Sequence, residues 1–283
     1  MKFLSFQSGK AASYGAVIED GVYDLGKRFG KQWPTLRAAL KAGKLGELKA
    51  AAKKARKADL PLARVRFLPV IPDSKKIICV GLNYRAHREE TGRGDTVHPT
   101  LFLRLAASQV GHGQPLIKPK ESQSLDWECE LAVIIGRAGR RVPKAKAMGL
   151  IAGYSCYNDG SVRDYQRHTS QFTPGKNFVA TGGFGPYLVT PDEVGDITKQ
   201  TMTTKVNGVE KQRTTIDMMI TDIPSLIEYI TIFTTLQPGD VIVTGTPGGV
   251  GAARNPPEFM KPGDVCEVEI SNVGLLRNTI KEG

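Results

Sequence analysis

Short apolar stretches alternate with glycine and proline along most of the chain after residue 74. Stretches of this length, rich in β-branched and aromatic residues and bounded by turn residues, are typical of β-strands. They are 76–82, 100–108, 125–136, 150–158, 184–190 and 201–212. The Asn207-Gly208 pair in the last stretch predicts a tight hairpin, because both residue types readily adopt positive φ angles. The pattern predicts a strand-rich fold with few helices.

Two segments carry a helical pattern instead. Residues 222–236 begin with Asp222 as a capping residue and Pro224 in the first turn. Three apolar residues then share one stripe, Leu226, Ile230 and Phe233. Residues 45–64 are rich in alanine and lysine and predict a helix with one long basic side, which ends at Pro61. We expect the helices to lie at the periphery of the strands.

The beginning of the chain predicts a separate small unit. Strand patterns at 1–7 and 14–25, the second with an Asp-Gly turn, precede the basic helix. Residues 67–75 contain two prolines and predict a linker. The sequence therefore predicts an N-terminal α/β domain at residues 1–70 and a larger domain at residues 74–283. The predicted fold class is α+β and rich in strands.

The net charge of +11 raises the question of an anionic partner. Six of the cationic residues lie in the basic helix, and no aromatic residue stands between them, so a solvated helix face is predicted rather than a nucleic-acid site. The four cysteines form no CxxC pair, which suits a reducing compartment. No apolar run approaches the length of a membrane span. We expect a cytoplasmic protein that binds neither nucleic acid nor membrane.

Three acids open the strand pattern at 125–136, which is unusual for a buried strand. Alternate side chains of a strand share a face, so Asp126, Glu128 and Glu130 point the same way, about 7 Å apart per step. The glutamates would repel each other unless a divalent cation lies between them. A strand end that faces water is the alternative, but the apolar residues 131–136 that follow suit a strand buried on both faces. Asp126 is the weaker ligand candidate and is expected nearer to solvent.

A further acid, Asp159, follows the strand pattern at 150–158. Together with Glu128 and Glu130 it would supply three hard oxygen ligands, which favour Mg²⁺ or Mn²⁺ over zinc. Asp164 is expected to pair with Arg163 or Arg167 instead of the metal.

His87 and Glu90 form a candidate catalytic pair. They are three residues apart, so they meet on one face of a helical turn. The carboxylate can orient the imidazole, whose other nitrogen then takes a proton from water. A surface histidine in a loop is the alternative.

Several motifs in this order resemble the fumarylacetoacetate hydrolase family: VGLNYRAHREETG, LDWECELAVIIGR, YNDGSVRDYQ, TPGKNF, FGPYLVT, LQPGDVIVTGTPGGVG and KPGDVCEVEI. The resemblance covers residues 74–283. It implies a mixed β-roll catalytic domain, a homodimer, and Mg²⁺ or Mn²⁺ bound by Glu128, Glu130 and Asp159. It also implies that the His87–Glu90 pair orders over the ligand.

The resemblance further implies that Lys176 lies beside the metal, and that Gln166 and Thr246 hydrogen-bond the substrate. The chain departs from the family at Arg104, where many members have a lysine followed by proline. Arg104 could grip a substrate carboxylate in bidentate fashion or pair with an acid nearby. His98 has no assigned role. The glycine-rich segment 244–251 lacks the Lys-Ser/Thr of a phosphate loop, which argues against a nucleotide site.

The first hypothesis is a metal-dependent hydrolase that cleaves a C–C bond of an acylpyruvate or related 2,4-dioxo acid through a pyruvate enolate. An oxaloacetate decarboxylase and an isomerase or tautomerase of a 2-hydroxymuconate-type dienoate are the alternatives, because the same three acids serve each of them. The His87–Glu90 pair favours the hydrolase, since only that reaction needs an activated water. In every case the partner is a small 2-oxo acid.

Overall fold

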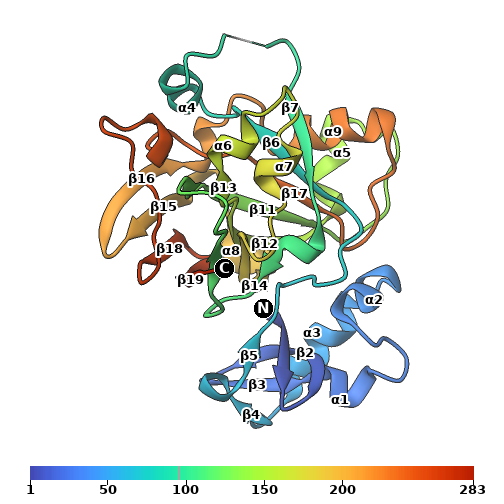
Figure 1. Cartoon of the computed structure of the whole chain (residues 1–283). Coiled ribbons are helices and arrows are strands. Elements are labelled where there is room, and N and C mark those ends of the chain that lie inside the picture. The colour runs from blue at the N-terminus through green and yellow to red at the C-terminus, as the bar shows by residue number, and fades with distance from the viewer. Residues whose placement is uncertain (95) are drawn as a thin grey trace.

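The computed structural model describes residues 1–94 and 96–283 and is built on one large mixed sheet (Figure 1). The short strands β5 (Arg66–Phe67) and β8 (Gln109–Val110) pair with it at β1 and β14. The sheet's main path runs through β4 (Leu60–Pro61), β3 (Gly21–Asp24), β2 (Ala11–Ile18), β1 (Lys2–Ser8), β14 (Gly182–Val189), β12 (Ile151–Asn158), β11 (Cys129–Ile135), β17 (Val241–Val243), β6 (Ile77–Gly81) and β7 (Thr100–Arg104).

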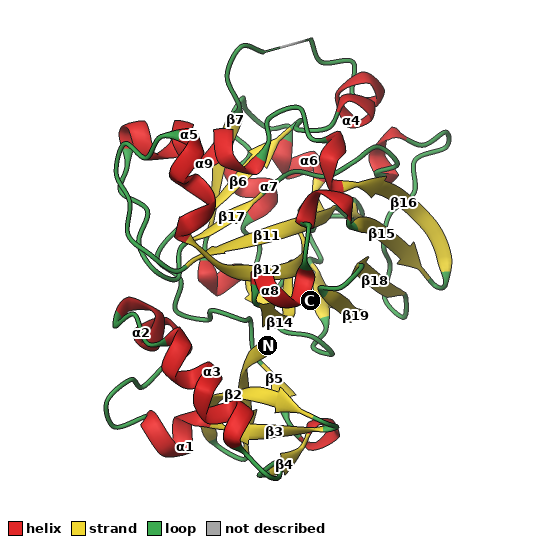
Figure 2. Cartoon of the chain, turned by 180° about the vertical axis from the view of Figure 1, so that it is seen from behind, coloured by secondary structure: helices red, strands yellow, loops and turns green. Residues whose placement is uncertain are grey.

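A second sheet packs against the middle of the first (Figure 2). It runs through β16 (Val209–Thr215), β15 (Thr201–Val206), β18 (Val265–Ile270), β19 (Gly274–Glu282) and β9 (Leu116–Lys118), and a separate two-stranded ladder joins β10 (Leu125–Asp126) to β13 (Ser161–Val162). The β15–β16 connection is the predicted hairpin, with Asn207 and Gly208 at φ angles of 51° and 78°. That prediction is confirmed.

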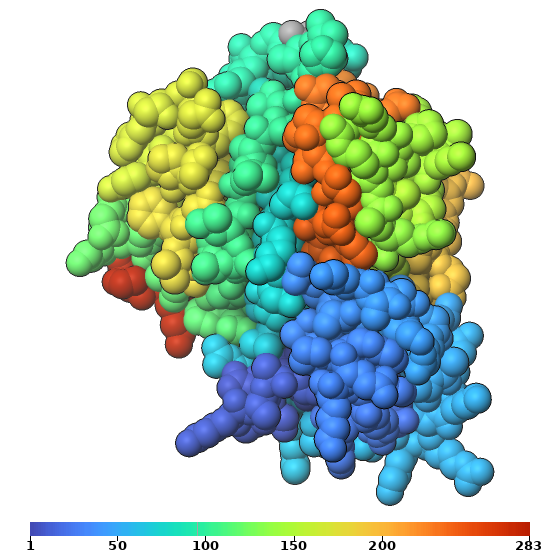
Figure 3. Space-filling model, turned by 90° about the vertical axis from the view of Figure 1, so that its right-hand side faces the viewer, coloured from blue at the N-terminus to red at the C-terminus, as the bar shows by residue number. Residues whose placement is uncertain are grey.

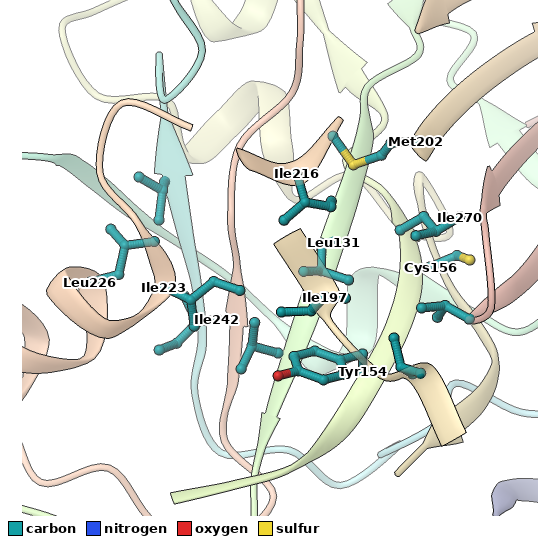
Figure 4. Close-up of a cluster of buried hydrophobic side chains, with 14 of the residues drawn as sticks. Leu131, Tyr154, Cys156, Ile197, Met202, Ile216, Ile223, Leu226, Ile242 and Ile270 are labelled. Atoms are coloured by element: carbon teal, nitrogen blue, oxygen red, sulfur yellow. The ribbon is translucent and has the colours of Figure 1, made fainter. Parts of the chain in front are cut away.

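Strand β11 separates two hydrophobic cores. Cys129, Leu131 and Val133 point into the core between the two sheets, which Figure 4 shows with Met202 and Ile270 from the second sheet. Ala132 and Ile134 of β11 point into the other core, against the N-terminal unit. Every residue of β11 is buried. The prediction of a strand buried on both faces is confirmed, and its reason is that both faces carry a packed layer.

The helices surround the sheets, as predicted (Figure 2). They are α1 (Leu25–Phe29), α2 (Leu36–Lys41), α3 (Leu45–Lys54), α4 (Arg85–Glu90), α5 (Lys144–Ala147), α6 (Arg163–Gln166), α7 (Thr173–Lys176), α8 (Pro191–Val194) and α9 (Ile223–Phe233). Single turns of 3₁₀ helix lie at Leu62–Arg64, Ala106–Ser108, Met148–Leu150, Ile197–Lys199, Ile216–Met218 and Gly251–Ala253. The fold is thus α+β and strand-rich.

Two helix predictions need correction. Helix α3 ends at Lys54 rather than at Pro61, because Leu60 and Pro61 form β4 on the edge of the sheet. Helix α9 begins as predicted, with the Asp222 carboxylate accepting from the Ser225 amide. Its Phe233, however, is 58% exposed, because the apolar stripe leaves the core in the last turn.

The N-terminal unit lies at the end of the molecule opposite α4 (Figure 1), and it packs beneath the layer of α5 and α9 (Figure 3). Strand β1 pairs with β2 on one side and with β14 on the other. The large sheet therefore contains strands from both sides of the predicted linker, residues 67–75. The division into two domains remains a prediction.

Candidate metal centre and active site

Three carboxylates meet where β11 and β12 begin to separate. The antiparallel register pairs Cys129 with Asn158, and the Asp159 amide donates to the Glu128 carbonyl at 2.9 Å. One carboxylate oxygen from each of Glu128, Glu130 and Asp159 lies within 4.8 Å of the others. All three side chains are buried. The acids that the sequence predicted as a group are brought together.

The two glutamates point the same way because the strand alternates. The Cys129 side chain between them points into the hydrophobic core. Glu130 accepts a hydrogen bond from the Gly245 amide at 2.5 Å, and this bond fixes its carboxylate against the glycine-rich segment. The Asn158 side chain accepts from the Glu128 amide at 3.1 Å. Backbone and side-chain bonds therefore hold the acids in place.

Three buried cations accompany these acids. Lys176, at the end of α7, donates to Glu128 Oε2 and Asp159 Oδ2, at 2.6 Å each. Arg163, at the start of α6, contacts Glu128 Oε1 at 2.7 Å and Asp126 Oδ2 at 2.8 Å. Lys176 therefore lies beside the acids, as predicted.

Arg104 is the third buried cation. Its Nη1 donates to Asp159 Oδ1 at 2.6 Å, and its Nη2 donates to Thr181 Oγ1 at 2.9 Å. The side chain is completely buried. Of the two roles predicted for Arg104, the placement corresponds to the pairing with a nearby acid. Arg104 does not line the cavity described below, and its role in gripping a substrate carboxylate stays a prediction.

Two neighbouring acids differ from the prediction. Asp126 is fully buried instead of solvated, and its carboxylate accepts from the amides of Gly251 at 2.8 Å and Ala252 at 2.9 Å. It therefore anchors the glycine-rich segment. Asp164 does not pair with an arginine, because the Ser122 and Ser124 hydroxyls donate to it instead.

The charges leave one acid without a cation. Burial opposes the charged form of Glu128, but Lys176 and Arg163 outweigh it and lower its pKa to about 2. Burial raises the pKa of Glu130 well above its ordinary value, and the nearby Asp159 and Glu128 raise it further. Among the described residues Glu130 has no ion pair. A buried carboxyl without an ion pair, beside two further carboxylates, fits a site completed by a divalent cation, and oxygen donors alone fit Mg²⁺ or Mn²⁺.

A cavity of about 310 Å³ opens above the acids. Most of the predicted site residues line it: His87, Glu90, Glu128, Glu130, Gln166, Lys176 and Thr246. The Gln166 side-chain oxygen accepts from Arg163, and the Thr246 hydroxyl accepts from Gln212, so both are held in fixed positions. The geometry brings together residues that are more than 150 positions apart in the sequence.

His87 and Glu90 form the predicted pair on α4. His87 Nδ1 and Glu90 Oε1 are 2.7 Å apart, and Glu90 Oε2 accepts from the Gly249 amide at 2.7 Å. His87 is 6% exposed and helical, which rules out a surface loop. With Nδ1 donating to the carboxylate, Nε2 keeps the lone pair of a base.

The sequence did not single out every residue of the cavity. Arg163 was considered only as a partner of Asp164, although it contacts Glu128. Its position one helical turn from Gln166 is the signal that could have found it. Arg93, Arg167 and Phe172 line the cavity as well, and no pattern marked them. His98 stacks on Tyr229 with ring centroids 5.4 Å apart and does not line the cavity.

None of the helices in the described part of the chain is both long and apolar enough to cross a membrane.

The chain is similar to several known proteins. Residues 76–281 match the family model described as fumarylacetoacetate (FAA) hydrolase C-terminal. The chain is 39% identical to the mitochondrial oxaloacetate tautomerase FAHD2A of Bos taurus over 223 residues, which are 78% of this chain and 71% of the relative. It is 32% identical to the solved fumarylacetoacetate hydrolase of Exiguobacterium antarcticum, with a TM-score of 0.82 and complete coverage of both chains.

A second solved structure was determined with bound ligands. The maleylpyruvate hydrolase of Sphingobium sp. SYK-6, in complex with manganese(II) ion and pyruvate, is 28% identical over the whole of both chains, with a TM-score of 0.82.

Proposed function

The chain belongs to the fumarylacetoacetate hydrolase family, and we propose that it is a Mg²⁺- or Mn²⁺-dependent enzyme that moves a proton between the keto and enol forms of a 2-oxo acid. The observation that carries the proposal is the group of Glu128, Glu130 and Asp159, of which the two glutamates line a cavity that also contains a buried base. The bovine tautomerase and the manganese and pyruvate of the Sphingobium hydrolase support it.

A divalent ion held by the three carboxylates would supply the Lewis-acid charge that stabilises an enolate. The protein's own residues supply the rest. Lys176 keeps a second positive charge at the same end of the cavity. Burial lowers the pKa of Lys176, but Asp159 and Glu128 raise it by more, so the pKa lies above its ordinary value. That charge favours an oxyanion over a neutral carbonyl. Thr246 and Gln166 line the cavity in fixed positions, where they can orient the substrate.

His87 is the proton-transfer group in this proposal. Its Nδ1 is tied to Glu90, so Nε2 is available to take a proton from the carbon beside the oxo group and to return it. Glu90 stabilises the imidazolium that forms in between. The Gly249 amide fixes Glu90 and therefore also the direction of the imidazole ring.

Hydrolysis of a C–C bond in a 2,4-dioxo acid is the second candidate. The His87–Glu90 pair favours it, since an oriented imidazole can equally take a proton from water. The two reactions share the enolate and differ in the atom that gives up the proton. Decarboxylation of oxaloacetate needs a base to take a proton neither from carbon nor from water, so the His87–Glu90 pair gives no support to it.

The experiment is a product assay of the Mg²⁺- and Mn²⁺-loaded protein on oxaloacetate and on acetylpyruvate. Keto–enol exchange is followed by ultraviolet absorbance, cleavage of acetylpyruvate by released pyruvate, and decarboxylation of oxaloacetate by released CO₂. The proposal expects exchange that is lost with a chelator and reduced about 100-fold or more in His87→Ala. Full activity in the presence of chelator would refute it. A larger effect of His87→Ala on pyruvate release than on exchange would favour the hydrolase.

Several further properties are proposals of the same kind. We expect a homodimer, as the resemblance to the family implies, and a location in the cytoplasm. The bovine relative is named mitochondrial, so cell fractionation is needed to decide the location. Binding of nucleic acid is not expected, because Lys53 and Lys54 of α3 are exposed without aromatic partners in the described part of the chain, and Lys49 pairs with Asp192.

A further inference from the structure

The cavity contains two kinds of cation. Lys176 and Arg163 are buried, and each is paired with the acids of the floor. Arg93 and Arg167 also line the cavity, but both are exposed residues at its mouth. Within residues 1–94 and 96–283 neither of these two arginines forms an ion pair. The mouth therefore carries two positive charges that form no ion pair with an acid in the described part of the chain.

Aromatic rings connect the mouth to the floor. The Arg93 guanidinium lies over the Phe172 ring, 5.5 Å from its centroid. Phe172 contacts Phe102 edge to face at 5.6 Å, and Lys176 Nζ lies 5.1 Å from the Phe102 centroid. Arg93 and Lys176 thus stand at opposite ends of one wall, with two apolar rings between them.

Arg167 reaches the mouth from another element. It follows α6 directly, and its amide donates to the Asp164 carbonyl at 3.0 Å, which ends the helix there. Arg93 follows α4 in a similar way, with its amide donating to the Arg88 carbonyl at 3.2 Å. The two guanidiniums come from the segments after α4 and α6, on different parts of the rim.

From this arrangement we propose that Arg93 and Arg167 bind a second carboxylate at the far end of the substrate, so that the enzyme prefers 2-oxo dicarboxylates to 2-oxo acids with a neutral tail. The proposal rests on the proposed function, because it takes the 2-oxo acid end to lie at Glu128, Glu130 and Asp159. Guanidinium groups suit this role, since each can donate two parallel hydrogen bonds to one carboxylate. The apolar rings between the ends accept the methylene groups of such a substrate.

The alternative is that both arginines serve only as solvated charges that attract any anion. Such an effect depends on net charge and not on position. It raises the affinity for a 2-oxo monocarboxylate and a dicarboxylate through long-range attraction, and other surface arginines contribute to it equally.

The test compares dissociation constants for ligands of equal carbon number, measured by calorimetry on the Mn²⁺-loaded protein. The pairs are 2-oxoglutarate with 2-oxopentanoate and 2-oxoadipate with 2-oxohexanoate, and pyruvate reports on the 2-oxo acid end alone. We expect at least one dicarboxylate to bind about tenfold more tightly than the monocarboxylate of equal carbon number, since a charge-assisted hydrogen bond contributes about that much. In Arg93→Ala/Arg167→Ala the ratio should fall to about 1. Because the ratio compares two ligands on one variant, a general loss of binding cancels.

Arg56→Ala/Arg64→Ala is the matched control, because it removes two exposed arginines of the N-terminal unit. It should leave the ratio unchanged, and Arg93→Lys/Arg167→Lys should keep only part of it. A ratio near 1 in the unmodified protein that still binds pyruvate, or a ratio that survives Arg93→Ala/Arg167→Ala, would overturn the tail site alone. Equal loss in the control would make the attraction non-specific and would also overturn it. Failure of pyruvate to bind would refute the proposed function, and the tail site with it.

Discussion

Glu128 and Glu130 are chemically identical and only two residues apart, yet replacing each by glutamine should affect the stability of the metal-free protein to very different extents. Glu128 is ionised between Lys176 and Arg163, which hold its pKa at about 2. Glu130 has a pKa raised well above its ordinary value by burial and by the neighbouring acids. In the metal-free protein Glu130→Gln therefore replaces a protonated group, whereas Glu128→Gln removes a charge.

The magnitude follows from the pKa of Glu128. A tenfold change in a dissociation constant corresponds to about 1.4 kcal/mol, so a fall from 4.5 to about 2 stabilises the folded protein by about 3 kcal/mol. Because the pKa is lowered in the folded state, this contribution is complete above pH 4.5 and is lost as the pH falls towards 2. Glu128→Gln should lower the melting temperature at pH 7 by roughly 6–12 °C. Glu130→Gln should change stability by less than about 1 kcal/mol, since the amide can still accept from Gly245.

The assay is thermal and urea unfolding of both variants in the presence of chelator, at pH 7 and at pH 3. Glu269→Gln, an exposed glutamate of β18, is the control for loss of a negative charge. The difference between Glu128→Gln and the unmodified protein should shrink at pH 3, where the unfolded chain takes up the proton. Equal destabilisation by the two glutamine variants, or a larger effect of Glu130→Gln, would refute the assignment of charges.

Three further outcomes are expected. Uptake of Mg²⁺ or Mn²⁺ should release a proton from Glu130, so the affinity for the metal should rise with pH. The heat of metal binding should then differ between buffers of different ionisation enthalpy, and a heat that does not depend on the buffer would contradict this. Arg163→Met leaves Asp126 and Glu128 partly unpaired and should cost about 3–5 kcal/mol by urea unfolding, with Arg163→Lys milder. Gly249→Ala should reduce turnover at least about tenfold. Gly249 has a φ of +100°, and a Cβ there would meet the Lys211 carbonyl oxygen and displace the amide that holds Glu90. Unchanged turnover would show that Glu90 does not need this hydrogen bond.

Local sequence patterns predicted the local structure well. The Asn207-Gly208 hairpin and the capped start of α9 at Asp222 are decided by residues a few positions apart. The alternation around Cys129 likewise placed Glu128 and Glu130 on one side. The end of α3 was missed, because β4 draws Leu60 and Pro61 to the sheet edge, and a tertiary contact of this kind leaves no periodic signal.

The grouping of the three acids was predictable from the sequence, but their charge balance was not. Three acids near two strand ends indicated a metal. Nothing in the sequence shows that Arg104 turns inward to Asp159, or that Asp126 holds the amides of Gly251 and Ala252, since those partners are up to 126 positions apart. The roles of buried charges depend on which partners the fold brings near, and spacing along the chain does not report this.

Strand β11, with a packed layer on each side, has a consequence for how the enzyme can diversify. Its amides should be among the slowest in hydrogen–deuterium exchange, since no local opening frees them without parting both layers. Glu130 in this strand and Glu128 directly before it are therefore held by a backbone that is packed on both faces. The segments after α4 and α6 carry no such restraint on their exposed arginines. New substrate preferences in this scaffold should therefore arise by substitution of residues at the mouth of the cavity, while the acids and their buried partners stay the same.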